Sequence, residues 1–325
     1  MMKDVSQAAA VNGGRFSLQP SRLMFFPDPT QAEAGLFARA AAGEAVAQLW
    51  HSPLSLVVPG SYKRFAALES ARQQFAADGC PVFLRKSGGG LVPQGPGIVN
   101  VSLAYPIART LGEAAEEVYE HLCAILRSAL AARGVVAHWQ AVEGSFCDGR
   151  FNLACGDGEA ARKIAGTAQY WRPVASQPAD EARRHVVLAH AVLLVDCDLA
   201  AAHRYANQFE AALGSGRHYQ AEKTVSVAQM APDATHDLRD EIVDALRAAI
   251  LRSRHRCNLA GRSELHLDLR GRTEGPPSRH TCDTFYCGGR TRILTCCFSF
   301  TSASKPCSTK SASSIRLVTS LSAWK

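Results

Sequence analysis

The chain has 325 residues, of which 47% are apolar, so it is long enough to bury a sizeable core in one large domain or two smaller ones. Its net charge of +7 is concentrated after residue 270, where eight Lys or Arg residues stand against two acids, and the rest carries only +1. This near-neutral body excludes nucleic acid as an expected partner, because a phosphate backbone requires basic residues clustered on one face.

Helix and strand patterns alternate along the body. Apolar residues at helical spacing, or Ala-rich composition, predict helices at 31–50, 62–77, 113–132, 199–213 and 236–251. Short apolar runs predict strands at 54–58, 81–84, 98–103, 135–142, 151–155, 164–169, 186–195 and 224–229. Several strands are short and close together, which indicates hairpins. We therefore expect an α/β (or α+β) fold with a mixed β-sheet flanked by helices and no internal repeat.

The two ends of the chain differ from this body. Residues 1–28 are polar and punctuated by Gly and Pro, and we expect a flexible segment there. Residues 270–325 are rich in Ser, Thr and Cys and keep no helical or strand period. That change predicts a disordered tail or a frameshifted sequence rather than a second folded domain. The main domain is accordingly placed at 29–269.

Cysteine usage and hydropathy indicate the cellular compartment in which the protein is expected. Five of the eleven cysteines lie in the tail, and the other six form no C-x-x-C pair, so neither a zinc site nor a disulfide framework is predicted. His51, His138 and His190 likewise lack a matching ligand set, and no metal site is expected. The most apolar stretch, 186–195, is only about half of a ~20-residue membrane span. We therefore expect a cytoplasmic protein with no membrane partner.

A glycine run follows the strand at 81–84, in the sequence RKSGGG from Arg85 to Gly90. Three consecutive glycines allow the backbone to lie flat against a ligand and to offer N–H groups to an oxygen, although a flexible turn is the alternative. The run does not match a P-loop. A dinucleotide-binding loop would continue as a helix, where Pro93 and Pro96 stand. A simple nucleotide loop is therefore not predicted.

A second motif region runs from Gly144 to Gln169. It contains GSFCDGRFNL and then KIAGTAQ, which begins at Lys163. A lysine that opens an apolar, small-residue strand is either a solvated strand end or a charge directed at a ligand. Gly166 and Ala168 would let a ligand or a neighbouring backbone approach closely.

The strings RKSGGGLV, DGRFNL, KIAGTAQ and HAVLLVD, in this order, resemble motifs of the lipoate-protein ligase A / octanoyltransferase superfamily. The superfamily shares its fold with biotin-protein ligases, and the resemblance spans about residues 45–255. It implies a biotin/lipoate ligase-like catalytic domain within 29–269. The sequence departs from the pattern at Pro93-Gln94, where a His is usual, and at Ala191, where a Gly is usual.

The resemblance also implies roles for individual residues. Lys163 would reach the acyl carbonyl and, in a ligase, the phosphate of an acyl-adenylate, which suits a compact cation. The loop Gly88, Gly89 and Gly90 would line the acyl tunnel, and Arg85 would support the loop and the negative end of the ligand. The remaining substrate-binding residues that it implies are Ser87, Asp148, Asn152, Gly166, Thr167, Ala168 and His190.

Cys147 introduces a different chemistry. Some octanoyltransferases of the superfamily use a cysteine just before the lysine-containing strand, and Cys147 lies sixteen positions before Lys163. A thiol activated by Lys163 or Arg150 could hold an acyl chain as a thioester. A buried, inert cysteine is the alternative.

Three functions are therefore considered. The first is a ligase that uses ATP and Mg²⁺ to make an acyl-adenylate of lipoate or octanoate and passes the acyl group to a lysine of a lipoyl-domain protein or the glycine-cleavage H protein. The second is an ATP-independent octanoyltransferase that takes its acyl group from acyl carrier protein onto Cys147. The third is a non-catalytic acyl-binding protein of the same fold. The tail does not resemble the accessory domain of many ligases, which favours the transferase or a partner that supplies this part.

Overall fold

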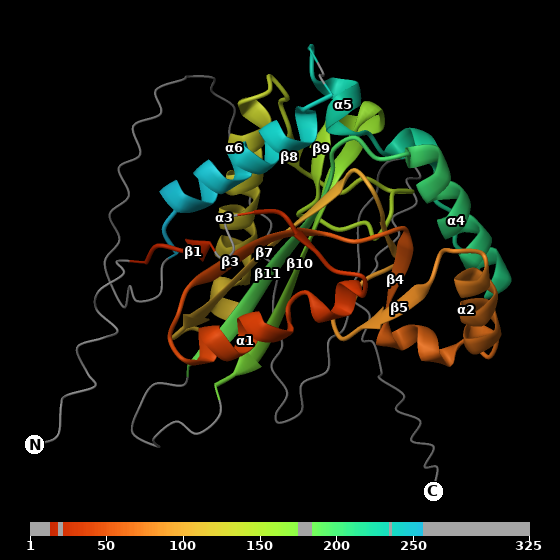
Figure 1. The fold of residues 1–325 in the computed structure, drawn as a ribbon, viewed down its shortest axis with the longest axis horizontal. Coiled ribbons are helices and arrows are strands. Elements are labelled where there is room, and N and C mark those ends of the chain that lie inside the picture. The colour runs from red at the N-terminus through yellow and green to blue at the C-terminus, as the bar shows by residue number, and fades with distance from the viewer. Residues whose placement is uncertain (1–13, 19–21, 175–183, 234–235, 256–325) are drawn as a thin grey trace, which may run out of the picture. The chain divides into compact units, whose positions relative to one another are not determined.

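The structure is a computed structural model that describes residues 14–18, 22–174, 184–233 and 236–255 (Figure 1). The predicted tail at 270–325 lies outside the described residues, as do residues 1–13 of the N-terminal segment and residues 256–269 of the predicted domain. Within the described ranges, no helix is both long and apolar enough to cross a membrane.

An eight-stranded sheet lies at the centre of the fold, in the order β1-β3-β7-β11-β10-β9-β8, with β2 also paired to β3 (Figure 1). Its strands are β1 (Ser17–Leu18), β2 (Met24–Phe25), β3 (Val46–His51), β7 (Ile98–Ile107), β8 (His138–Trp139), β9 (Leu153–Cys155), β10 (Arg162–Pro173) and β11 (His185–Leu194). The long strands β7, β10 and β11 are antiparallel, whereas β1 and β2 run parallel to β3. The predicted mixed sheet is therefore confirmed.

Helices cover both faces of this sheet. α3 (Leu111–Ala131) and α6 (Leu238–Arg252) pack on one face, and α1 (Ala34–Ala41) packs on the other (Figure 1). α3 begins with a capping box, because Thr110 and Glu113 each bond the other's backbone N–H. With both faces covered, β7 is buried along almost its whole length, which explains its continuous apolar run.

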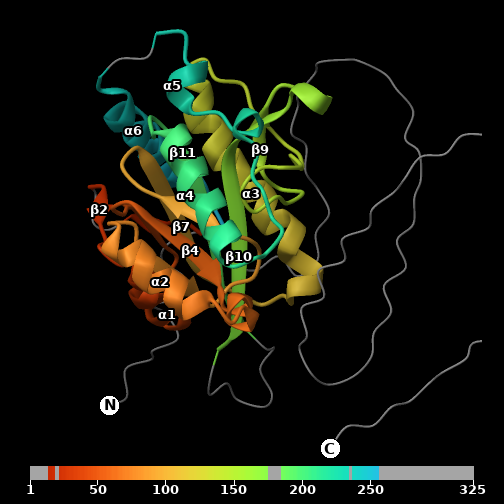
Figure 2. The ribbon, with the colours of Figure 1, turned by 90° about the vertical axis from the view of Figure 1, so that its right-hand side faces the viewer.

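A smaller sheet has the order β5-β4-β6 and stands beside the main one (Figure 2). Its strands are β4 (Ser55–Pro59), β5 (Val82–Arg85) and β6 (Val92–Gln94). Together with α2 (Leu68–Ala77) and α4 (Leu199–Ala212) it encloses a separate apolar cluster that includes Leu56, Phe75 and Phe209. β5 ends at Arg85, so the glycine run Gly88–Gly90 follows directly from the end of this sheet.

The predicted helix at 31–50 is wrong over its second half. The helix ends at Ala41, and Gly43 adopts a φ of +99°, a left-handed conformation that ends a helix without steric cost. Residues Val46–His51 then pair with β7, because the edge of that strand offers backbone partners that an Ala-rich propensity cannot anticipate.

Other predicted bounds also shift. The helix expected at 62–77 begins at Leu68, after a 3-10 turn at Gly60–Arg64, and the strand expected at 135–142 is reduced to β8. The strand expected at 224–229 is wrong: Ser226 and Gln229 form a capping box that starts the short helix α5 (Val227–Met230).

The N-terminal segment is not loose throughout. β1 and β2 pair with β3, and Phe16 is buried against Tyr105 with ring centroids 5.6 Å apart. The prediction of a flexible segment at 1–28 is therefore wrong for these residues. The burial of the Phe16 ring and the backbone pairing of β1 and β2 hold them in place.

Candidate active site

Arg85 closes the glycine loop through its guanidinium. Its two terminal nitrogens donate to the carbonyl oxygens of Val57 at 2.9 Å, Gly88 at 2.9 Å and Gly90 at 2.6 Å. Arg85 thus joins two carbonyls of the loop to one in the middle of β4, and the planar, multi-donor head of an arginine suits this task better than a lysine would.

The glycines bring the loop backbone against Cys147. The Gly90 N–H donates to Cys147 Sγ at 3.1 Å, and a Cβ on Gly89 would lie 2.7 Å from the same sulfur. Gly89 also has a φ of +102°, which side-chain-bearing residues rarely adopt. The three glycines do not line the cavity described below, contrary to the expectation that they would form its wall. At Gly89 and Gly90 the absence of a side chain allows close contact with Cys147, whereas a Cβ on Gly88 would meet nothing within 4 Å.

Cys147 is half-buried and has a φ of 45°, which among the described residues makes it the one non-glycine in the left-handed region. Such strain persists only where surrounding contacts impose it, and it is frequent at functional sites. Burial lowers the pKa of Arg85, and this shift is opposed by the negative charge of a Cys147 thiolate and by a hydrogen bond to that side chain. A Cβ built on Gly89 would lie 2.7 Å from Cys147 Sγ and 3.1 Å from Arg85 Nη2, so the thiol and the guanidinium lie side by side.

Lys163 lies beneath the Cys147 backbone and is only 5% exposed. Its Nζ donates to the carbonyl oxygens of Phe146 and Cys147, the latter at 3.1 Å. Burial lowers the pKa of Lys163 to about 8, against the opposing effects of negative charge on Cys147 and Asp148. A Cβ on Gly166 would lie 3.1 Å from Lys163 Nζ, so this glycine makes room for the lysine.

The motif DGRFN shapes the loop rather than the cavity. Asp148 Oδ1 accepts hydrogen bonds from the Val142 N–H at 2.7 Å and from Asn152 Nδ2 at 3.1 Å. Asp148 and Asn152 do not line the cavity, and their hydrogen bonds fold the loop that carries Cys147. Arg150 points outward to Glu116 at 2.8 Å, which leaves Lys163 and Arg85 as the cations beside the thiol.

A cavity of about 450 Å³ lies between the main sheet, α1 and the loop after β5. Among the residues predicted for the site, its lining contains Arg85, Ser87, Cys147, Lys163, Gly166, Thr167, Ala168 and His190. Much of the wall is apolar, from Phe37, Leu84, Leu188, Val192 and similar side chains. An apolar cavity with a thiol and two cations beside it suits an acyl chain whose carbonyl meets Cys147.

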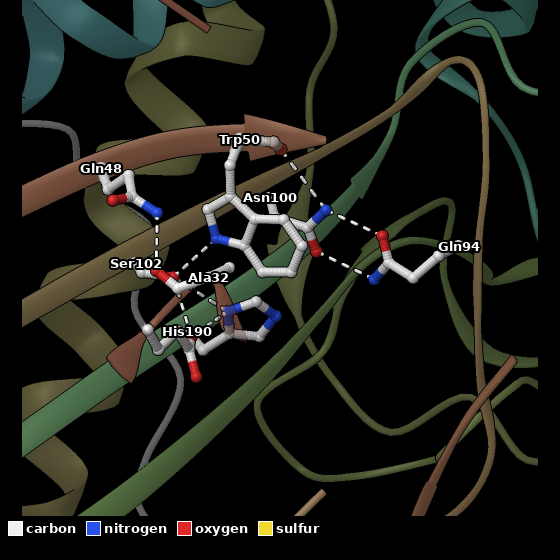
Figure 3. A network of polar contacts seen from close by, with 8 residues as sticks. Ala32, Gln48, Trp50, Gln94, Asn100, Ser102 and His190 are labelled. Atoms are coloured by element: carbon white, nitrogen blue, oxygen red, sulfur yellow. Dashed lines mark hydrogen bonds and ion pairs between the residues drawn. The ribbon is translucent and has the colours of Figure 1, made fainter. Parts of the chain in front are cut away.

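Polar side chains lie in a single row across the main sheet, and one of them, His190, lines the cavity. Gln48, Ser102 and His190 lie in register on β3, β7 and β11, and we call these three residues the polar row. Figure 3 shows Trp50, Ser102 and His190 directed toward one another, with Trp50 Nε1 donating to Ser102 Oγ at 2.9 Å. The row is therefore held by contacts between neighbouring strands.

Glu33, which precedes α1, contacts Ser102 and His190, and it is included below as a fourth member of the polar row. Its Oε1 accepts from Ser102 Oγ and lies 2.8 Å from His190 Nδ1. Burial alone would raise the pKa of Glu33, but the charge of His190 and hydrogen bonds from His190 and Ser102 lower it overall. Glu33, Trp50 and Gln94 also line the cavity. Glu33 and Trp50 were missed in the sequence because no local motif marks them, and Gln94 was noted only as a departure from the superfamily pattern.

Gln94 and Asn100 exchange two hydrogen bonds, at 3.0 and 2.8 Å (Figure 3). These bonds fix the amide of Gln94, which stands where the superfamily pattern has a histidine. Elsewhere in the described chain, no three His, Cys, Asp or Glu side chains are grouped closely enough to hold a metal ion.

The chain is similar in sequence to a known protein family and to several known proteins. The model of the lipoyl protein ligase A/B catalytic domain matches residues 30–249. An uncharacterized protein of Cupriavidus necator is 58% identical over 231 residues, covering 69% of this chain and 91% of that protein. A Kyrpidia tusciae protein named octanoyl-[GcvH]:protein N-octanoyltransferase is 36% identical over 167 residues, covering 51% of this chain and 56% of that protein.

A structural relative shows the fold alone. The crystal structure of a lipoate-protein ligase A bound with ATP aligns with a TM-score of 0.50 at 15% identity, covering 73% of this chain and 85% of that one.

Proposed function

The chain belongs to the family of lipoyl protein ligase A/B catalytic domains, an acyl-transferring family, and we propose that it transfers an octanoyl or lipoyl group through a thioester on Cys147. The main support for this proposal is the location of the Cys147 thiol and its contacts. Cys147 Sγ lies at the cavity, accepts the Gly90 N–H and stands beside Arg85, so negative charge on the sulfur has two partners.

The reaction has two steps. Cys147 Sγ attacks the carbonyl carbon of the donor, a carbon–sulfur bond forms, and the donor's carrier leaves with a proton. The amine of the acceptor lysine then attacks the thioester, a carbon–nitrogen bond forms, and the thiolate is released as the amine loses a proton. Lys163 Nζ donates to the carbonyl oxygen of Cys147, so its positive charge lies close to the reacting thiol. This charge stabilises the negative charge that develops in both steps.

The donor and acceptor are both carrier proteins in this proposal. The Kyrpidia relative is named for transfer of octanoyl from GcvH, which supports a lipoyl domain or GcvH on either side of the reaction, with acyl carrier protein as the other candidate donor. The apolar cavity would hold the acyl chain, and Glu33 and His190 would face it.

A second candidate is the ATP-dependent ligase. Arg85, Lys86 and Lys163 line one cavity, and cations at this density suit the phosphates of ATP and of an acyl-adenylate. In that reaction lipoate, ATP and Mg²⁺ would be substrates, and Lys163 rather than Cys147 would be indispensable for activation of the acid.

Intact-protein mass spectrometry separates these candidates. Wild type incubated with octanoyl-acyl carrier protein, and separately with octanoyl-GcvH, should gain one octanoyl mass, and Cys147→Ser should gain none. Cys197→Ser is the matched control, because Cys197 is the other half-buried cysteine of the described chain and should leave the adduct intact.

The contrary outcomes are distinct. A wild type that never gains the adduct, yet modifies a lipoyl domain when lipoate and Mg-ATP are added, would establish the ligase. A wild type that does neither, while still binding octanoate, would be a non-catalytic acyl-binding protein.

A further inference from the structure

A buried polar cluster lies behind the nucleophile, outside the cavity. Glu210 of α4 is 0% exposed, and its Oε1 accepts hydrogen bonds from the hydroxyls of Tyr62 at 2.5 Å and Tyr219 at 2.7 Å. Arg217 donates to the Tyr62 hydroxyl at 2.6 Å. A buried carboxylate in an otherwise apolar cluster is costly, and such groups are retained where they hold something in place. We call these four residues the Glu210 cluster.

One member of the Glu210 cluster touches the residue before the nucleophile. The ring of Tyr219 packs on that of Phe146 with centroids 5.1 Å apart, and His203 packs on the same ring at 4.3 Å. The carbonyl of Phe146 is an acceptor for Lys163 Nζ. The position of Phe146 therefore affects both the thiol that follows it and the lysine beneath it.

The segment that begins at Tyr219 also braces the loop through its backbone. Asn207 of α4 exchanges two hydrogen bonds with the Tyr219 backbone, at 2.9 and 2.8 Å. The next residue, Gln220, donates its N–H to the Gly144 carbonyl at 2.9 Å, and Val225 donates to the Lys163 carbonyl at the same distance. One short segment thus contacts the loop before Cys147 and the strand that carries Lys163.

We propose that Tyr219, fixed by the buried carboxylate of Glu210, is a positioning residue that sets Phe146 and through it the relation between Cys147 and Lys163. The inference rests on the proposed function for its chemistry, but its geometry is independent of the acyl donor. A small misplacement of reacting groups by a distant side chain can slow a reaction by as much as about 10²-fold.

Two matched variants test this proposal. Tyr219→Phe and Tyr62→Phe each remove one hydroxyl from the same Glu210 oxygen, but only the Tyr219 ring packs on Phe146. Tyr219→Phe should slow single-turnover acylation of Cys147 by about tenfold, whereas Tyr62→Phe should stay within about twofold of wild type. Glu210→Gln keeps an acceptor for both hydroxyls and should remain near the wild-type rate.

A substrate-independent readout accompanies the acylation rate. Alkylation of Cys147 by iodoacetamide is followed on the tryptic peptide 134–150, whose sole cysteine is Cys147, so other cysteines do not interfere. Thermal unfolding of each variant is measured in parallel. Asn207→Ala, which frees the Tyr219 backbone, is a second route to the same loss and serves if Tyr219→Phe unfolds.

Equal slowing by Tyr219→Phe and Tyr62→Phe, in proportion to lost stability, would overturn the positioning role, as would wild-type rates in both Tyr219→Phe and Asn207→Ala. A wild type that is alkylated at Cys147 but never acylated would instead refute the thioester mechanism. In that case the alkylation rates of the variants still decide the role of Tyr219.

Discussion

Around the cavity, the loop of Cys147 and the polar row are held in different ways. Cys147, Gly89 and Gly90 meet through backbone atoms and a bare sulfur, with no space for an added carbon. Glu33, Ser102 and His190 meet through side-chain atoms at the ends of flexible bonds. The loop of Cys147 tolerates no added volume, whereas the side chains of the polar row can adjust. Substitutions in the loop should therefore change the reaction rate, and substitutions in the polar row should change the binding of the acyl chain.

The largest effect is expected at Lys163. Lys163→Ala removes the buried charge beneath Cys147, and loss of one such electrostatic contact typically slows reaction by ~10² to 10³. Single-turnover acylation measures this loss. Lys86→Ala is the control, because Lys86 lines the same cavity but is exposed, and it should cost at most about threefold. Wild-type acylation by Lys163→Ala would remove Lys163 from the site.

A smaller but still large effect is expected at the glycine loop. Gly89→Ala places a Cβ 2.7 Å from Cys147 Sγ in an unfavourable backbone conformation, so acylation should slow by roughly 10- to 100-fold. Gly88→Ala is the matched control, since nothing lies within 4 Å of its added Cβ and its φ is ordinary. If both variants react alike, contact with the sulfur is not what the glycine provides.

The polar row should give a milder effect. Glu33→Gln keeps an acceptor for Ser102 but loses the charge opposite His190, so the donor's KM should rise about threefold while the acylation rate constant stays unchanged. Glu44→Gln, which breaks an exposed ion pair with Arg39, is the control and should change neither quantity. A fall in the rate constant alone would place Glu33 with the reactive loop.

The smallest effect concerns stability and pH. The pKa of Glu33 is lowered in the folded protein, so its ionised form contributes stability above the ordinary value of 4.5, and this contribution is lost as pH falls through the lowered folded value. The difference in free energy of unfolding between wild type and Glu33→Gln should therefore be largest near neutral pH and shrink in acid. Urea unfolding at pH 7 and at pH 3 measures it; a constant difference would contradict this assignment.

The difference between the loop of Cys147 and the polar row also explains which site residues could be predicted from the sequence. Arg85, Cys147 and Lys163 lie in short motifs whose spacing is local, and the structure brings all three to one cavity. The long helix α3 was also predictable, because its apolar stripe and its capping residues are local signals.

The polar row could not be predicted in this way. Its alignment depends on the register of β3, β7 and β11, which joins residues 48, 102 and 190 only after the sheet has formed. Glu33 lay inside an Ala-rich stretch with no sign of a partner. Asp148 and Asn152 carried a motif, but the motif could not distinguish contact with a ligand from bonds that fold the loop.

The left-handed backbone conformation of Cys147 implies a conflict between thermal stability and activity. A side-chain-bearing residue pays roughly 1–2 kcal/mol in this conformation, whereas glycine adopts it freely. Cys147→Gly should therefore melt at a higher temperature than Cys147→Ser, although both lack the thiol, and calorimetry can compare them. Selection for thermal tolerance alone would favour replacement of Cys147, so a thermostable version of this protein that keeps the thiol must gain its stability elsewhere.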